Sequence, residues 1–449
     1  MMKQRATFNS KLGLLMAAVG SAVGLGNIWR FPCEAGEHGG GAFLIVYIFC
    51  VLILGTVVML AEFFIGRASQ KDSVGAFKTL APKNTAWKIL GYNGVVAAFL
   101  IFGFYSVISG WTLEYMYQSA AGNLNAGSVA EFTENFGNFT SDAFRPVLWV
   151  LVFTLIVHAV VLSGVKKGIE RASKIMMPVL FVILTILCVR SLMLPNAVEG
   201  LKFFFTPDFD KITSTVVLSA LGQAFFSVSV GMGCMITYAS YFKKSINMPR
   251  TTVSVVTLDT LVAILAGVII FPAVASFGIS PSQGPTLVFV TLPNIFQQMP
   301  FGSLWAFIFF MLLAIAALTS IISLHEVATA YLHEQHKMSR FKAATIVSSC
   351  GFVLGVICSL SFGVLSHFKI FGATIFDLLD FVTANLMLPI GGMFICIFVG
   401  WFVNKKVLKN ELTNNGTLKF GLFSVFVFLT KYVAPIIIAL VCLKQLGLF

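Results

Sequence analysis

Asp259 is a lone carboxylate in a long apolar stretch of the sequence, TTVSVVTLDTLVAILAG (251–267). The preceding charged residue, Arg250, lies about two helical turns away, so Asp259 does not sit at the end of this stretch. An ionisable side chain inside an apolar span needs a partner and marks a functional site. Asp259 is therefore a candidate functional residue.

Two other apolar stretches are interrupted by glycine in the same way. The first carries Gly24 and Gly26 followed by Asn27, and the second carries Gly231 and Gly233. A glycine inside a helix costs about 1 kcal/mol relative to alanine, so these clusters predict broken helices. A break leaves backbone N–H and C=O groups free to bind a substrate and ions in mid-membrane. The alternative is that the small residues only allow helices to pack closely.

The composition places these stretches in a membrane. Hydrophobic residues make up 58% of the 449 residues and charged residues only 11%, whereas soluble domains are near one-quarter charged. A spanning helix needs about 20 mostly apolar residues. We therefore predict an all-α polytopic membrane protein with eleven transmembrane helices, near residues 12–36, 41–66, 88–118, 145–163, 169–192, 215–242, 251–277, 301–333, 342–364, 375–402 and 421–444.

The basic residues are distributed unevenly in a chain whose formal net charge is +12. Most of them fall in segments that would share the side of the N-terminus, and the polar stretch 119–144, which we expect to be an outside loop, contains no Lys or Arg. The positive-inside rule then places the N-terminus in the cytoplasm and, with an odd helix count, the C-terminus outside. We expect a multi-pass protein of the cell (plasma or inner) membrane, and the positive charge requires no nucleic-acid partner.

The sequence does not predict an enzyme or a resident metal centre. The eight Cys residues form no CxxC pair and lie mostly in apolar runs, where cysteine behaves as a small hydrophobic residue. The stretch LHEVATAYLHEQH (324–336) lacks the HExxH zinc pattern. His158 stands alone in its helix, and we expect it to be packed and hydrogen-bonded.

Three motifs resemble those of the neurotransmitter:sodium symporter family: AVGLGNIWRFPCEAGEHGGGAF (22–43), GQAFFSVSVGMG (222–233) and KKGIERASKIMMP (166–178). The likeness covers nearly the whole chain and is greatest to prokaryotic amino-acid transporters of the leucine-transporter type, in an eleven-helix variant. It implies a 5+5 inverted repeat in which helices 1 and 6 are broken. The expected divisions are a first repeat at 1–192, a second at 193–402, and the eleventh helix with a short C-terminus at 403–449.

The resemblance implies two sodium sites. The substrate carboxylate would complete the first site, which would couple ion binding to substrate binding. For the hydroxyls of the second site, the sequence leaves open that they bond to their own helix. The implied ligands are Ala22, Asn27, Ser227 and Asp259 in the first site, and Gly20, Val23, Ala316, Thr319 and Ser320 in the second.

The resemblance also bears on chloride. Chloride-dependent members of the family have a neutral residue at the position of Asp259. We expect the Asp259 carboxylate to supply the fixed negative charge itself, so that no chloride is required. Protonation of the same carboxylate would make transport depend on pH.

The implied function is sodium-coupled symport of neutral, hydrophobic or aromatic L-amino acids into the cell by alternating access. The half-helix N-terminus at Gly26 and the Tyr105 hydroxyl would bind the substrate carboxylate. Gly24 stands where monoamine transporters of the family have Asp, which favours a substrate with its own carboxylate. The expected substrate-binding residues are Ala22, Leu25, Gly26, Ile101, Tyr105, Phe226, Ser227, Ser229, Met232, Ser320 and Leu324.

Two gates are implied by the same likeness. Arg30 and Asp380 would form the outer pair, with Phe226 as a lid over the substrate. Arg5 and Glu334 would form the inner pair, next to Phe8 and Tyr241. In addition, Gly168 and Pro178 would loosen the start of helix five, because both weaken helical hydrogen bonding.

Other functions remain open at this point. Proton coupling, or transport of a betaine-like or gamma-amino compound, would suit the same fold. A channel or a non-transporting sensor is a further alternative, although the sequence has neither a repeated pore loop nor a segment long enough for a signalling domain. We expect the partners to be a small amino-acid substrate and the lipid bilayer, and the protein to be a monomer or a weak homo-oligomer.

Overall fold

The computed structural model describes residues 7–82, 85–278 and 287–445. Helices dominate these ranges, and the only β-type pairing in them is an isolated bridge between Ile370 and Ala373. The helices are α1 (Lys11–Ala22), α2 (Phe31–Glu37), α3 (Gly41–Cys50), α4 (Thr56–Ser69), α5 (Ser73–Leu80), α6 (Lys88–Ala120), α7 (Val129–Ser141), α8 (Arg145–Leu162), α9 (Glu170–Leu192), α10 (Ala197–Phe205), α11 (Ser214–Ser227), α12 (Cys234–Ala239), α13 (Met248–Ser276), α14 (Leu292–Gln297), α15 (Gly302–Gln335), α16 (Arg340–Leu360), α17 (Ile375–Phe381), α18 (Leu388–Ile397), α19 (Lys405–Leu412), α20 (Phe423–Phe428) and α21 (Ala434–Gln445).

Short π- or 3-10-helical segments join or extend several of these helices. They are η1 (Gly26–Arg30), η2 (Val51–Gly55), η3 (Val165–Ile169), η4 (Phe209–Lys211), η5 (Leu287–Thr291), η6 (Val382–Met387), η7 (Phe398–Phe402) and η8 (Leu429–Val433).

The helices are long and apolar enough to make this a polytopic membrane protein. Within the described residues, nine helices meet the length and hydropathy of a membrane span, and ten do if one bent pair counts as a single span. The predicted sixth span is not among them, because the structure divides it into a 14-residue helix, α11, and a 6-residue helix, α12. The prediction of broken first and sixth helices is thus confirmed, whereas the count of eleven stays a prediction.

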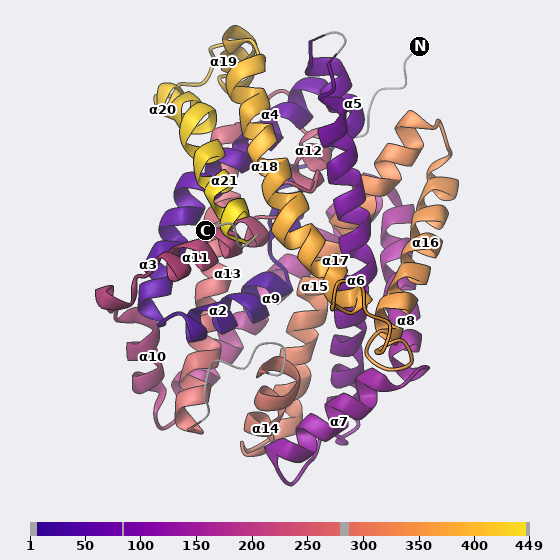
Figure 1. Ribbon diagram of the computed structural model, residues 1–449, viewed down its shortest axis with the longest axis vertical. Helices are drawn as coiled ribbons and strands as arrows, with labels where there is room; N and C mark the ends of the chain where they lie inside the picture. Colours follow the sequence, from indigo (N-terminus) through magenta and orange to yellow (C-terminus); the bar gives the residue numbers. More distant parts are fainter. Residues whose placement is uncertain (1–6, 83–84, 279–286, 446–449) are drawn as a thin grey trace.

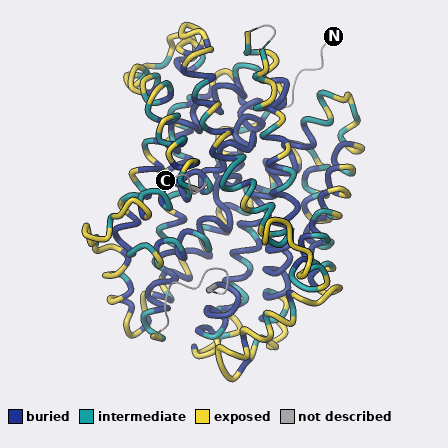
Figure 2. The backbone as a smooth tube through the Cα atoms, in the orientation of Figure 1, coloured by how far each residue is buried: buried dark blue, intermediate teal, exposed yellow. Residues whose placement is uncertain are grey.

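Most spanning helices run roughly along the long axis of the molecule (Figure 1). The short helices α7, α10 and α14 lie toward one end and α5 and α19 toward the other. The interior is buried and the exposed residues lie at the periphery and the two ends (Figure 2). Large apolar side chains such as Phe49 and Val182 are also exposed, as expected of surfaces that face lipid.

One polar segment differs from the sequence prediction. The stretch 119–144, expected to be an outside loop, contains the 13-residue helix α7. Ser128 caps this helix by accepting a hydrogen bond from the Glu131 N–H at 3.3 Å. The Phe136 ring of α7 stacks on Phe289 of η5, with ring centroids 5.5 Å apart, so α7 is packed onto the body of the protein.

A chain of polar side chains links three helices inside the bundle. His158 Nδ1 of α8 lies 2.9 Å from the Ser348 hydroxyl of α16, which lies 2.7 Å from His325 Nε2 of α15. His325 Nδ1 in turn lies 3.0 Å from the Thr329 hydroxyl. The expectation of a packed, hydrogen-bonded His158 is confirmed. Because unpaired polar groups are costly in a bilayer, this chain fixes how the three helices meet.

Candidate functional site

The first break separates α1 from η1 at residues 23–25. The chain bends by 53° between the helical segments on its two sides. A Cβ atom at Gly24 would lie 2.6 Å from the Ser320 hydroxyl and 2.9 Å from the Tyr105 hydroxyl. The break therefore brings the backbone so close to α6 and α15 that only glycine fits there.

The second break, between α11 and α12, contains Ser229, Gly231 and Gly233 with φ values of 52°, 85° and 75°. The N–H of Gly231 donates to Oε1 of Glu62 at 2.6 Å, and this carboxylate is fully buried in α4. Leu388 crowds the other side, because a Cβ at Gly231 would meet its carbonyl oxygen at 2.2 Å. Glu62 thus holds the break open. The sequence analysis missed it, although a lone acid in an apolar run is the same signal that identified Asp259.

A cluster of oxygen-bearing side chains lies where the two breaks meet. Asn27 Nδ2 donates to the Ser227 hydroxyl at 2.9 Å and to Asp259 Oδ1 at 2.8 Å. The Ser227 hydroxyl donates to Asp259 Oδ2 at 2.6 Å. The structure therefore brings together the three side chains predicted as ligands of the first sodium site. Tyr47 was missed; its hydroxyl lies 3.0 Å from that of Ser227, and an apolar helix with one tyrosine gives no sign of it.

The Asp259 carboxylate has no basic partner among the described residues. Its side chain is fully buried, and only the neutral groups of Asn27 and Ser227 bond to it. A buried, ionised carboxylate needs a compensating positive charge. The cluster is therefore suited to bind a small cation among its oxygens.

A second contact joins α1 to α15. The Ser320 hydroxyl donates to the carbonyl oxygen of Val23 at 2.9 Å, and a Cβ at Gly20 would lie 3.1 Å from the Cβ of Thr319. Thr319 donates to the Ala316 carbonyl at 3.0 Å. The two hydroxyls thus behave differently. Thr319 bonds to its own helix, whereas Ser320 bonds across to the break. Of the five residues predicted for the second sodium site, Gly20, Ala316, Thr319 and Ser320 lie on α1 and α15, and Val23 directly follows α1 in the break.

A central cavity of about 30 Å³, enough for roughly two waters, lies between the breaks. The Tyr105 hydroxyl accepts a hydrogen bond from the Leu25 N–H at 2.8 Å beside this cavity. Two lining residues, Ser21 and Ser323, were missed; their hydroxyls bond to each other at 2.8 Å, and serines in apolar helices carry no distinctive signal. Of the predicted substrate-binding residues, those lining the cavity are Ala22, Gly26, Ile101, Tyr105, Phe226, Ser229, Met232, Ser320 and Leu324.

The two remaining residues predicted to bind substrate lie outside this lining. Ser227 belongs to the oxygen cluster, and Leu25 lines a second, outer cavity of about 320 Å³. Gly26, Tyr105 and Phe226 line both cavities, so Phe226 lies between them, and its role as a lid stays a prediction.

The outer gate residues face one cavity without pairing. Arg30 and Asp380 both line the outer cavity, but the ion pair that Arg30 makes is with Glu34, at 3.6 Å. The Arg30 guanidinium also lies 4.8 Å from the centre of the Phe226 ring. The predicted Arg30–Asp380 pair is therefore not closed in this structure, because Glu34, one turn further along the same helix, takes the guanidinium.

At the opposite end the N-terminal segment packs on the chain that follows α12. The Phe8 N–H donates to the Tyr241 carbonyl at 3.2 Å, and the two rings meet edge to face at 6.1 Å. The Tyr241 hydroxyl donates to Glu326 at 2.7 Å, and Glu326 pairs with Arg340 at 2.6 Å. The sequence analysis missed this acid–base pair, because it weighed the stretch around Glu326 only as a metal motif.

Two further predictions concern this end. Arg5 lies outside the described residues, and its predicted partner Glu334 accepts a hydrogen bond from the Asp72 N–H at 3.0 Å. Gly168 lies in the π-helical segment η3, and α9 continues through Pro178. The start of helix five is therefore irregular at Gly168 but not unwound.

Known proteins resemble this chain over nearly its full length. The family model described as "Sodium:neurotransmitter symporter family" matches residues 5–139 and 132–448. A sodium-dependent transporter of Bacillus subtilis, YhdH, is 40% identical over 98% of this chain and 97% of its own length. A sodium-dependent transporter of Haemophilus influenzae is 36% identical over 99% of each chain. The crystal structure of MhsT in complex with L-phenylalanine superimposes with a TM-score of 0.90, at 44% identity, over 98% of this chain and 100% of that chain.

Proposed function

This chain belongs to the sodium:neurotransmitter symporter family, and from that premise we propose that it carries neutral, hydrophobic or aromatic L-amino acids into the cell with sodium and without chloride. The family and its relatives are sodium-dependent transporters, so the protein is a membrane transporter and not an enzyme. The substrate class, the number of sodium ions, the direction of transport and the independence from chloride belong to the proposal.

The observation that carries the proposal is the buried Asp259 carboxylate with no basic partner in the described part of the chain. In the bilayer interior it needs a cation or a proton. The Ser227 hydroxyl oxygen already lies within hydrogen-bond distance of this carboxylate, whereas Asn27 contacts it through Nδ2 and its Oδ1 accepts from the Gly24 N–H. A sodium ion would exchange these hydrogen bonds for ion contacts to the oxygens. In family members with a neutral residue at the position of Asp259, chloride would supply this negative charge; here the Asp259 carboxylate would supply it.

The broken first helix suits a substrate carboxylate. The backbone at residues 24–26 is not paired within a regular helix, and the Tyr105 hydroxyl lies beside it. A carboxylate placed there would accept from this hydroxyl and from the N-terminus of η1. It would also lie next to the oxygen cluster, so that one group of the substrate would contact both the protein and the ion. That shared contact would make sodium and substrate bind cooperatively.

The side-chain end of the cavity is apolar. Ile101, Phe226, Met232 and Leu324 line it, and none of the lining residues is charged. Burying a charged substrate side chain there would leave it without a partner, so acidic and basic amino acids should be rejected. That MhsT was solved with L-phenylalanine supports a hydrophobic or aromatic substrate.

The cavity of about 30 Å³ is smaller than such a side chain and would have to widen. Met232, an unbranched thioether with several rotatable bonds, is the lining residue most able to move. Widening would precede or accompany the closure of Phe226 over the substrate. The contacts of Phe8 with Tyr241 would then have to separate for release on the inner side.

Uptake of radiolabelled amino acids into proteoliposomes tests the proposal. A sodium, potassium or proton gradient is imposed in turn, and chloride is replaced by gluconate. Sodium-driven uptake of Leu, Phe or Trp that is indifferent to chloride is the expected result. Uptake driven by protons alone, or of betaine-like or gamma-amino compounds only, would favour the alternatives open from the sequence.

A further inference from the structure

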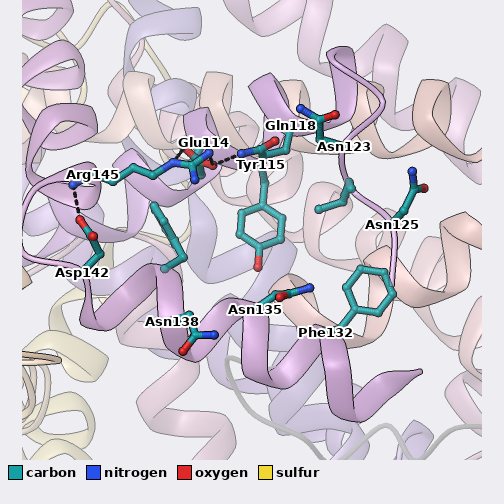
Figure 3. A pocket seen from close by; sticks show the side chains of 12 residues that line it. Glu114, Tyr115, Gln118, Asn123, Asn125, Phe132, Asn135, Asn138, Asp142 and Arg145 are labelled. Atoms are coloured by element: carbon teal, nitrogen blue, oxygen red, sulfur yellow. Dashed lines mark hydrogen bonds and ion pairs between the residues drawn. The ribbon is translucent and has the colours of Figure 1, made fainter. Parts of the chain in front are cut away.

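A second hollow, of about 380 Å³, lies at the end of the molecule where α7 crosses the bundle. It lies between the last turns of α6, α7 and the start of α8 (Figure 3). It shares no lining residue with the central and outer cavities. Its volume falls within the range of small-molecule pockets.

Tyr115 contributes a polar group to the wall of this hollow. Its side chain is only 6% exposed, and its hydroxyl has no hydrogen-bond partner in the part of the chain that the structure describes. Figure 3 shows the ring projecting from α6 into the hollow, with the hydroxyl directed toward α7. The hydroxyl opens on the hollow, so a molecule held there can hydrogen-bond to it.

Carboxamides line the rest of the hollow. Asn135 and Asn138 of α7 face Tyr115 from the opposite wall, and Asn123 lies at the edge beyond α6 (Figure 3). None of these three side chains makes a hydrogen bond to any described residue. Each carboxamide offers both donors and an acceptor, and the Tyr115 hydroxyl offers one of each. The hollow thus presents several uncharged groups of mixed donor and acceptor character.

The charged groups that line the hollow already have partners within the protein. Glu114 accepts from the Arg145 guanidinium at 2.6 Å, from Gln118 at 2.6 Å and from the Trp149 indole. Asp142 accepts from two backbone N–H groups at the start of α8, which lower its pKa. The charge that remains is slightly negative, so an anionic ligand is disfavoured.

We propose that this hollow binds an uncharged, hydroxyl-rich molecule of monosaccharide size. Each hydroxyl of such a molecule donates and accepts at once, which matches the carboxamides and the phenol. Phe132 and Phe139 of α7 offer apolar surface to its C–H face. A mainly apolar ligand would leave the amides unpaired, and a charged one would find no free counter-charge.

A ligand in this position bridges α6 and α7. The same α7 carries Phe136, which stacks on Phe289 of η5, so the ligand holds the outer helix against the body of the protein. Binding should therefore slow hydrogen exchange of the α7 amides. This readout is independent of amino-acid transport.

The test uses the full-length protein in lipid nanodiscs, because sugar-headed detergents would compete. D-glucose and myo-inositol are titrated by saturation-transfer NMR, with hydrogen exchange of residues 129–141 followed in parallel. We expect saturable binding that protects α7. Tyr115→Phe, which removes only the hydroxyl, should weaken the affinity about fivefold, and the double change Asn135→Ala with Asn138→Ala should abolish it.

Thr133→Ala is the matched control. Thr133 lies on α7 outside the lining, and its hydroxyl bonds to its own helix at 2.9 Å, so its removal should leave the affinity unchanged. Absence of saturable binding for both probes would overturn the proposal, as would binding that survives the double change. Preferential binding of L-phenylalanine at this hollow would overturn the assignment to an uncharged ligand. If Tyr115→Phe fails to fold, the two surface asparagines still decide the question.

Discussion

Asn27 Nδ2 lies 2.8 Å from Asp259 Oδ1, although the two residues are 232 positions apart in the chain. The contact joins the broken first helix to α13, and the Ser227 hydroxyl closes the group from the end of α11. Three elements thus meet at one buried carboxylate. Any movement of the first helix away from α13 changes the groups that contact this carboxylate, so the proposed sodium site would link ion binding to conformation.

Gly24→Ala should abolish high-affinity amino-acid binding without unfolding the protein. The added Cβ would stand 2.6 Å from the Ser320 hydroxyl and 2.9 Å from that of Tyr105, so the break would have to move away from both. We expect affinity to fall more than tenfold, as measured by equilibrium binding of a radiolabelled amino acid. Gly55→Ala is the control, because its Cβ would make only ordinary contacts of 3.4 Å or more. Equal behaviour of the two variants would contradict this role of Gly24.

Tyr105→Phe should weaken substrate binding about tenfold, the usual effect of losing a hydrogen bond to a charged group. The fold should be kept, because the ring remains and only the bond from the Leu25 N–H is lost. Competition binding against a series of amino acids measures the effect. Tyr432→Phe, at a partly exposed ring packed on Trp401, should have no effect. A Tyr105→Phe variant with unchanged affinity would exclude the hydroxyl from the substrate site.

We expect Glu62 to stabilise the second break. Glu62→Ala leaves the Gly231 N–H unpaired in a buried position, which costs about 1–3 kcal/mol of unfolding free energy. Glu62→Gln keeps an acceptor for this N–H, so the unfolding free energy should fall clearly less in this variant. Thermal unfolding in detergent, followed by tryptophan fluorescence, separates the two. If both variants unfold at the same temperature, the hydrogen bond to Gly231 is not what Glu62 contributes to stability.

Ser348→Ala should destabilise the bundle by about 1–3 kcal/mol, because it removes the common partner of His158 and His325. Ser359→Ala, on the same helix, is the matched control. The Ser359 hydroxyl is buried but has no partner among the described residues, so its removal should cost little. Comparable losses in the two variants would mean that the histidine chain adds nothing to stability.

Much of this architecture follows from local sequence. The boundaries of most spanning helices agree with the structure within a few residues, because runs of about 20 apolar residues have few alternatives in a bilayer. The glycine clusters located both breaks, and Asp259 stood out as the lone acid of its run. The family likeness then supplied Asn27 and Ser227, which no spacing rule would have paired with Asp259.

Other features depend on tertiary contacts that no local pattern encodes. Tyr47, Ser21 and Ser323 matter because of what lies opposite them, and their own helices look ordinary. The helix α7 was taken for a loop because its polar composition outweighed the spacing of its phenylalanines. The family likeness implied an Arg30–Asp380 pair, whereas in the structure Glu34 pairs with the same guanidinium.

The role of Asp259 is tested most directly by measuring uptake of a hydrophobic amino acid into proteoliposomes by the wild type and by Asp259→Asn, each in chloride and in gluconate. The account predicts that the wild type is driven by sodium equally in both anions. The variant should need a higher sodium concentration and should be stimulated by chloride, since its site has lost the fixed negative charge. Wild-type uptake that stops in gluconate, or a variant identical to the wild type, would contradict the account.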